Sequence, residues 1–370
     1  MTEIVYFDYN STTPPRPEVA DAMMEVLRVA GNASAVHASG RAARARVEDA
    51  RASISALIGA ETGQIIFTGS GTESNNQALR GAGRKRVIVS AIEHEAVLSA
   101  RKDAEIAPVN KDGTINLKSL ERLLAESDEP AQVAVMLANN ETGIIQPIAE
   151  AVAIAHRYGA LFHCDAVQAI GKIPVDVAAL GADSYAVSSH KFAGPQGVGV
   201  LVVRTPDAIG RFVHGGGQER GLRAGTENVA GIVGLGVAAE LASKALPKYA
   251  KLAELRDDLE RRLRDIAPDI IVFGQAGERL PNTTKLTMPG VPSDTQVMAM
   301  DLAGIAISAG SACAAGKVEP PYVLSAMGVP DDIATTAIRV SLGWRTRPEE
   351  LDKFVVAWEK LYNRIGRKAA

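Results

Sequence analysis

Lys191 lies at a point in the chain where a buried amine could do chemistry. It falls in "SYAVSSHKFAGPQGVGVLVV", residues 184–203, after an apolar run that predicts a buried strand and before a glycine-rich turn and a second apolar run. Burial lowers the pKa of a lysine, and the neutral amine that results is a nucleophile that can condense with an aldehyde. Most lysines are simply solvated, so evidence that Lys191 has a chemical role must come from other parts of the sequence.

Polar residues also follow other predicted strands. Short apolar runs alternate with amphipathic helical segments through the first two-thirds of the chain, which predicts a mostly parallel sheet covered on both faces. Ligands of such sheets bind beyond the carboxyl ends of the strands. The polar segments at these positions are "SGTESNN" (70–76), "EHE" (93–95), "NNETG" (139–143) and "DAVQ" (165–168). Taken singly, such segments are also compatible with ordinary helix caps and turns.

Taken together, these segments predict one ligand. Thr72, at the start of a predicted helix, and Ser188 suit a phosphate, because a helix N-terminus presents free N–H groups and a positive dipole end. His94 could cover a flat ring, Asp165 could hold the proton of a ring nitrogen, and Lys191 could take an aldehyde. Pyridoxal 5'-phosphate has all four features, and its protonated ring is an electron sink.

Length and composition limit the functional classes. The 370 residues suggest two domains, and a net charge of −3 with 4% aromatic residues argues against nucleic-acid binding. We identify no apolar run that approaches the roughly 20 residues of a membrane span, and no signal peptide, so we expect a cytoplasmic protein that meets no membrane. We expect residues 15–250 to form a large cofactor-binding domain. We expect residues 1–14 and 251–370 to form a smaller α+β domain, with a long helix within 225–266 bridging the two.

The two cysteines, Cys164 and Cys313, are too few for a disulfide framework. Cys164 precedes Asp165 on a predicted buried strand, and we interpret it as a packed core residue. Neighbours on a strand face opposite ways, so His163, Cys164 and Asp165 should not converge on a metal ion. Cys313 differs, because "ISAGSACAAGKVEP" surrounds it with small residues and predicts a poorly packed loop.

These motifs, taken in order, resemble those of one enzyme family. They include "YFDYNSTTPPRPEV", "EHEAVL", "FHCDAVQAIGKIPVD", "SSHKFAGPQGVGVL", "GGGQERGLRAGTEN" and "AIRVSLGWRTRPEELD". Along essentially its whole length, the chain resembles the cysteine desulfurases, which are class-V, fold-type-I pyridoxal-phosphate-dependent transferases. It is similar to the nitrogen-fixation-type and housekeeping iron–sulfur assembly branch. The resemblance implies an α/β fold and conversion of L-cysteine to L-alanine.

The resemblance also implies roles in the cofactor site. Lys191 binds the cofactor aldehyde as an imine, His94 stacks on the ring and Asp165 pairs with the pyridine nitrogen. Gln168 hydrogen-bonds the phenolic oxygen. Thr226 reaches the phosphate of the neighbouring subunit's cofactor, which implies a homodimer. The phosphate of the subunit's own cofactor is held by Gly71, Thr72, Ser188 and His190.

The substrate site is implied in the same way. Asn140 and Arg339 bind the substrate carboxylate, for which the planar fork of arginine is suited, although without the family Arg339 would be interpreted as a solvated strand-end residue. Lys191 removes the Cα proton, and His94 is a candidate to donate or accept protons. The thiolate of Cys313 attacks the substrate sulfur and becomes a persulfide. Its sulfur then passes to an acceptor protein, an iron–sulfur scaffold or another carrier.

Three other functions remain as alternatives. A selenocysteine lyase or a class-V aminotransferase would use the same cofactor, and the aminotransferase would not need Cys313. A catalytically silent partner subunit that binds regulators would be expected to have lost Lys191 or Cys313. The chain keeps both residues. A cysteine-dependent change in an imine absorption band is the simplest observation that separates these functions.

Overall fold

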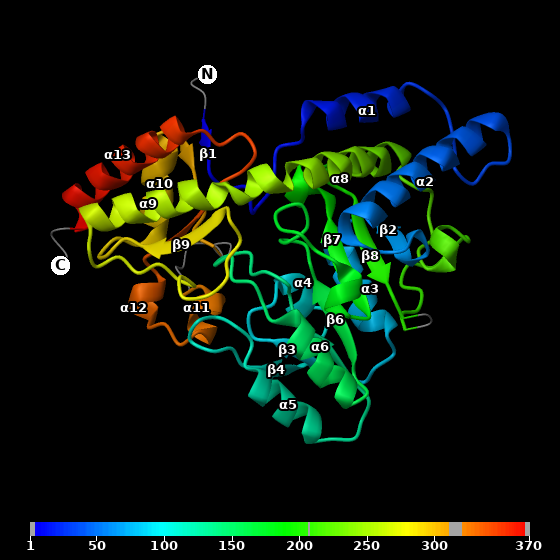
Figure 1. Ribbon diagram of the computed structural model, residues 1–370, viewed down its shortest axis with the longest axis horizontal. Helices are drawn as coiled ribbons and strands as arrows, with labels where there is room; N and C mark the ends of the chain where they lie inside the picture. The colour runs from blue at the N-terminus through cyan, green and yellow to red at the C-terminus, as the bar shows by residue number, and fades with distance from the viewer. Residues whose placement is uncertain (1–3, 206–207, 311–319, 367–370) are drawn as a thin grey trace.

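The computed structural model of the chain describes residues 4–205, 208–310 and 320–366. Two α/β units lie side by side, and a long pair of helices runs across both (Figure 1). The N-terminal strand belongs to the unit that also contains the C-terminal helix (Figure 1). Residues from opposite ends of the chain therefore meet in the smaller unit.

The larger unit is built on a sheet whose described strands have the order β2-β8-β7-β6-β5-β3-β4. The pairs from β7 to β4 are parallel, whereas β8 runs antiparallel to both β7 and β2. The strands are β2 (Ile65–Thr68), β3 (Arg86–Ser90), β4 (Glu105–Ala107), β5 (Ala131–Ala134), β6 (Leu161–Asp165), β7 (Ser184–Ser188) and β8 (Gly199–Val203). The predicted mostly parallel sheet is confirmed.

Helices pack around this sheet. Helix α2 packs against α8, as α1 does, while α3 lies against β7 and β8 and α6 against β6. The α-helices of this unit are α1 (Pro17–Leu27), α2 (Ala38–Ile58), α3 (Gly71–Gly81), α4 (Glu95–Leu98), α5 (Leu117–Ala125), α6 (Ile148–Arg157), α7 (Val177–Leu180) and α8 (Val229–Ala250). The described part of this unit also contains the 3-10 turns η1 (Thr62–Gln64), η2 (Ser189–Phe192) and η3 (Glu219–Gly221).

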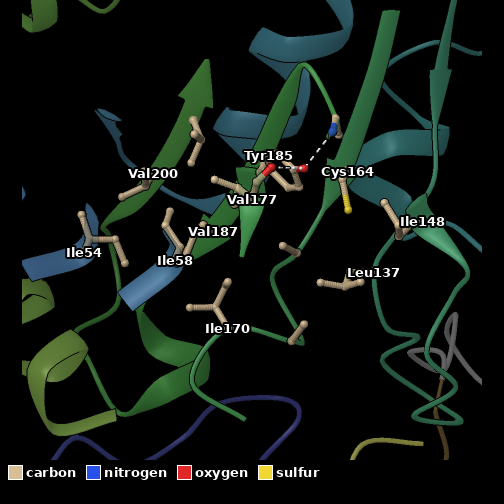
Figure 2. Packing of buried hydrophobic residues seen from close by; sticks show 14 of the residues in the cluster. Ile54, Ile58, Leu137, Ile148, Cys164, Ile170, Val177, Tyr185, Val187 and Val200 are labelled. Atoms are coloured by element: carbon tan, nitrogen blue, oxygen red, sulfur yellow. Dashed lines mark hydrogen bonds between the residues drawn. The ribbon is translucent and has the colours of Figure 1, made fainter. Parts of the chain in front are cut away.

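The core of the larger unit contains Cys164, which is fully buried among aliphatic side chains of the sheet and its helices. Figure 2 shows its sulfur on the same side of the sheet as Leu137 and Ile148. Burial raises the pKa of this thiol well above its usual value, which makes it unreactive. The prediction that Cys164 is a packing residue is confirmed.

The smaller unit has its own apolar core around Phe354, Trp358 and Leu259. Strands β9 (Thr283–Thr287) and β11 (Ala337–Ser341) pair antiparallel, and β1 (Val5–Tyr6) pairs parallel with β10 (Ile305–Ala306). Its helices are α9 (Leu252–Ile266), α10 (Ser293–Leu302), α11 (Tyr322–Ala326), α12 (Asp331–Ala334) and α13 (Pro348–Arg364). This is the α+β character expected from the sequence, while the domain limits 15–250, 1–14 and 251–370 stay a prediction.

The predicted long helix within 225–266 consists of two helices, α8 and α9, joined at Lys251 (Figure 1). By length and composition α8 could cross a membrane, so the statement that no run approaches such a length was wrong. In the folded chain, 56% of its most apolar window is buried, and it packs against α1 and α2.

Candidate active site

Lys191 lies in η2, directly after the carboxyl end of β7. Its Nζ donates hydrogen bonds to the backbone oxygens of Asn10 and Ser11, at 2.8 and 2.7 Å. Burial, followed by the positive charge of Arg339, lowers the pKa of Lys191 to about 8. An amine with this pKa is partly neutral near pH 7, so it is available as a nucleophile or a base.

Asp165 is the last residue of the neighbouring strand β6, and its side chain is buried. Oδ2 accepts a hydrogen bond from Asn75 Nδ2 at 2.7 Å, and Oδ1 accepts one from the backbone N–H of Val167 at 2.9 Å. The carboxylate is therefore supported by neutral donors and suits a cationic N–H in a ligand.

Helix α3 begins beside the end of β7. Ser70 caps it by accepting from the N–H of Glu73, and the amides of Gly71 and Thr72 precede that position at the positive end of the helix dipole. A Cβ on Gly71 would come within 2.8 Å of Val167 and 3.2 Å of Ser188. Glycine thus lets the helix terminus approach Ser188 closely, which forms a place for an anion.

The two histidines predicted for the site differ in their environment. His190 is partly buried in η2, where its Nδ1 lies 3.1 Å from Thr12 Oγ1. Burial and the charges of Lys191 and Lys172 lower the pKa of His190 to about 4, so it is neutral at pH 7. His94 is exposed at the start of α4, and its Nδ1 accepts from the N–H of Ala96 at 3.1 Å. That bond fixes the orientation of its ring.

Gln168 is held by a buried lysine that the sequence analysis missed. Lys172 Nζ donates to Gln168 Oε1 at 2.6 Å and to Asn10 Oδ1 at 2.7 Å, and Gln168 Nε2 donates to the backbone oxygen of Asn10 at 2.9 Å. Burial, with the charges of Lys191 and Arg339, lowers the pKa of Lys172 well below its usual value. Because the amide oxygen of Gln168 is engaged, its nitrogen is the group that can serve a ligand, as a donor.

Arg339 belongs to β11 of the smaller unit but contacts the larger one. Its guanidinium donates to Asp8 Oδ1 at 2.6 Å and to the backbone oxygen of Asn140 at 3.0 Å. Within the described residues, Arg339 Nε and Asn140 Oδ1 are buried and have no hydrogen-bond partner. Buried polar atoms are rarely left unpaired, so these two indicate a place for a polar ligand.

The structure does not bring all of the predicted residues together. Thr226 is exposed just before α8 and lines a cavity of about 130 Å³ with Thr68 and Arg223. Its predicted contact involves a neighbouring subunit and stays a prediction. Cys313 lies outside the described residues. A separate cavity of about 550 Å³, lined by Arg16, Trp344 and other residues, contains none of the predicted site residues.

Asn10 is the residue whose importance the sequence did not indicate. Besides its bonds to Lys172, Gln168 and Lys191, its Nδ2 donates to the backbone oxygen of Asn140 at 3.1 Å and to Thr283 Oγ1 at 2.9 Å. It joins the N-terminal segment, the large sheet and the smaller unit at one point. The polar run "DYNSTTP" was available as a signal, but nothing local distinguishes it from a surface loop.

Comparisons with known proteins identify the family of the chain. The model of the family "Aminotransferase class-V" matches residues 5–354. The chain is 40% identical to "Cysteine desulfurase IscS" of Dictyoglomus turgidum, over 99% of this chain and 96% of that protein. Its fold matches an X-ray structure of a NifS-like protein from Rickettsia africae, with a TM-score of 0.91, 34% identity and coverage of 98% and 100% of the two chains.

A third similar protein was solved with a ligand. This structure, "SspA in complex with cysteine", matches with a TM-score of 0.79 and 30% identity, over 91% of this chain and 98% of the other. The fold, the family match and the near-complete coverage of relatives lead to one conclusion. The chain belongs to the class-V aminotransferase family and, within it, to the cysteine desulfurases.

Proposed function

We propose that this chain is a pyridoxal-phosphate-dependent cysteine desulfurase. It converts L-cysteine to L-alanine, places the sulfur on Cys313 as a persulfide and passes it to an acceptor for iron–sulfur cluster or other sulfur-cofactor assembly. The observation that carries the proposal is the position of Lys191: its partly neutral amine follows β7, one strand from Asp165, and Arg339 acts on it electrostatically. Relatives named cysteine desulfurase support the substrate.

The residues present fit pyridoxal 5'-phosphate. Lys191 would bind its aldehyde, Asp165 would hold the ring-nitrogen proton, and the free N–H of Gln168 would meet the phenolic oxygen. His94 would cover the ring. The phosphate would lie at the start of α3, near Gly71, Thr72, Ser188 and His190. When bound, this group supplies an electron sink for charge that develops at the substrate Cα.

The side chains of this chain then divide the remaining work. Arg339 and Asn140 would bind the substrate carboxylate, which would accept a hydrogen bond from the Arg339 Nε–H that has no partner among the described residues. The neutral amine of Lys191 would take the proton from Cα, and its pKa of about 8 suits a base that works near neutral pH. His94 is placed by its bond to Ala96 and could exchange a proton with the substrate or its leaving group.

Sulfur transfer requires the thiolate of Cys313. Its electron pair forms an S–S bond to the substrate Sγ as the Cβ–Sγ bond breaks, and the bonding electrons stay with carbon, which is then protonated to give alanine. No external oxidant is needed, because the substrate carbon is reduced as the sulfur becomes part of a persulfide. The structure "SspA in complex with cysteine" supports cysteine as a ligand of this fold.

The assembly and location belong to the same proposal. The enzyme is a homodimer in which Thr226 completes the phosphate site of the partner subunit's cofactor. The acceptor is an iron–sulfur scaffold or another carrier that binds transiently, and the protein acts in the cytoplasm. The exposed position of Thr226, without a role in its own subunit's site, favours a contact in trans.

Mass spectrometry after incubation with L-cysteine tests the function. We expect stoichiometric alanine and a peptide containing Cys313 that gains one sulfur atom. Cys164 is the internal control, because its burial should keep it unmodified. Cys313→Ser should bind the cofactor normally and release no sulfide. Formation of alanine without a Cys313 persulfide, or persulfide on Cys164, would contradict the proposal.

A further inference from the structure

A row of buried side chains leads away from Asp165 into the protein. Asn75 Nδ2 lies 2.7 Å from Asp165 Oδ2, Asn75 Oδ1 lies 2.8 Å from His163 Nε2, and His163 Nδ1 lies 2.9 Å from Ser184 Oγ. The side chains come from α3, β6 and β7. Asn75, His163 and Ser184 are each at most 1% exposed, so water does not compete for these bonds.

The chemistry of each group fixes the direction of every bond in this row. An ionised Asp165 can only accept, so Asn75 must turn its amide nitrogen toward Asp165 and its oxygen toward His163. His163 Nε2 must then carry a proton and donate it. Burial lowers the pKa of His163 to about 3, so the ring is neutral at pH 7 and its Nδ1 is an acceptor. Ser184 is left to donate its hydroxyl to Nδ1.

We propose that Asn75, His163 and Ser184 are positioning residues that form a one-directional hydrogen-bond relay, which holds the Asp165 carboxylate oriented toward the ring nitrogen of the cofactor. Bonds that all point the same way polarise one another, which strengthens the donor that finally reaches the carboxylate. The relay adds no charge of its own. The negative charge of Asp165 is therefore left for the cation that the ligand presents.

A cationic histidine in the same place would have a different effect. It would pair with Asp165 through Asn75 and compete with the ring nitrogen for the negative charge. Burial of His163 in the sheet prevents this, since no charged partner contacts its ring in the described part of the chain. The burial of His163 and the amide of Asn75 between His163 and Asp165 thus have the same effect: both keep a positive charge of the protein away from the Asp165 carboxylate.

The tautomer of His163 is the first test, and it is measured in the unmodified enzyme, with a variant needed only to assign the signal. Nitrogen-15 NMR of the histidine-labelled enzyme distinguishes a protonated Nε2 from a protonated Nδ1, and His163→Gln identifies the signal. We expect a neutral ring with the proton on Nε2, with or without bound pyridoxal phosphate. A proton on Nδ1, or a cationic ring at pH 7, would overturn the relay. This result does not depend on the proposed reaction, so the two proposals can fail separately.

A graded series of variants is the second test, with pyridoxal 5'-phosphate titrated into the apoenzyme. A hydrogen bond to a charged group contributes roughly 1.5–3 kcal/mol, so Asn75→Leu should weaken cofactor binding by at least about tenfold. His163→Phe should weaken cofactor binding less and Ser184→Ala least, because His163 acts on Asp165 through Asn75, and Ser184 acts through His163 and Asn75. His163→Gln should lose less cofactor affinity than His163→Phe, since the amide N–H of glutamine can replace the N–H of Nε2.

The matched control is Gln132→Leu, which removes another buried amide from the same sheet. Among the described residues, the side chain of Gln132 bonds only to the backbone oxygen of Ala78, at 3.1 Å. It should leave the dissociation constant and the visible absorbance band of the bound cofactor unchanged. The relay variants should shift that band, and thermal unfolding of each apoenzyme reports whether it is folded. Equal losses in all variants, or no shift in Asn75→Leu, would overturn the proposal. If Asn75→Leu does not fold, Ser184→Ala and the tautomer still test it.

Discussion

The two sides of the active site are built in different ways. On the side of the large sheet, Asp165 and Lys191 follow the carboxyl ends of adjacent strands. On the side of the smaller unit, Arg339 and Lys285 lie within strands β11 and β9, directly opposite each other in an antiparallel pair. The first arrangement results from the topology of parallel sheets. The second places two cations side by side, which is unfavourable unless acids compensate.

The acids that compensate come from other parts of the chain. Lys285 Nζ lies 3.1 Å from Glu141 Oε2, both fully buried, and Arg339 pairs with Asp8 at 2.6 Å. The cation of Arg339 still acts across the site, where it lowers the pKa of Lys191. The comparison teaches that, among the described residues, the large unit provides the amine and the carboxylate of the site, while the smaller unit provides the positive field that tunes the amine.

The largest effect should come from the reactive side. Lys191→Ala removes both the group that would bind the aldehyde and the base, so alanine formation should fall by more than about 1000-fold in kcat/KM. The control is Lys248→Ala, an exposed lysine of α8, which should retain full activity. A rate for Lys191→Ala within tenfold of the unmodified enzyme would show that another group does this work.

The same comparison explains what the sequence could and could not predict. Lys191 and Asp165 were found because polar residues at strand ends follow from strand order alone. Lys285 and Asn10 were missed, because the contacts of Lys285 with Glu141 and of Asn10 with Asn140 join segments 130 or more residues apart and have no local pattern. Arg339 was identified only through the family resemblance. Asn75 and His163 belong to motifs that the sequence analysis identified. Their hydrogen bond links α3 to β6, so it could be recognised only once the fold was known.

The buried pair on the other side should have the next largest effect, on stability. Lys285→Met would leave Glu141 buried without its cation, which typically costs about 3–5 kcal/mol. The urea midpoint should fall accordingly. The double variant Lys285→Met with Glu141→Leu should regain most of the loss, because a matched apolar pair replaces two charges. An unchanged midpoint for Lys285→Met would show that the pair is not a structural link between the units.

Arg339 should give a smaller effect, in substrate binding. Arg339→Leu removes a bidentate partner for the substrate carboxylate, and we expect KM for L-cysteine to rise by about 100-fold. Arg339→Lys keeps the charge and loses the planar fork, so it should recover only part of this. A fall in kcat with an unchanged KM would indicate that Arg339 acts on Lys191 alone and does not bind substrate.

The smallest effect, a shift along the pH axis, would link the two sides. Because the pKa of Lys191 is about 8, the neutral fraction of its amine rises about tenfold per pH unit below pH 8. Above pH 8 this fraction approaches one and becomes constant. The rate at which the apoenzyme captures pyridoxal phosphate, corrected for the same reaction with N-α-acetyl-lysine, should therefore reach a plateau above pH 9.

In Arg339→Leu the loss of a nearby positive charge should move this inflection to higher pH. The opposite variant, Asp165→Asn, should move it lower, because the negative charge of Asp165 raises the pKa of Lys191. Shifts of opposite sign can come only from the field at the amine, since a general loosening of the site would move both variants in the same direction, toward the pKa of a solvated lysine.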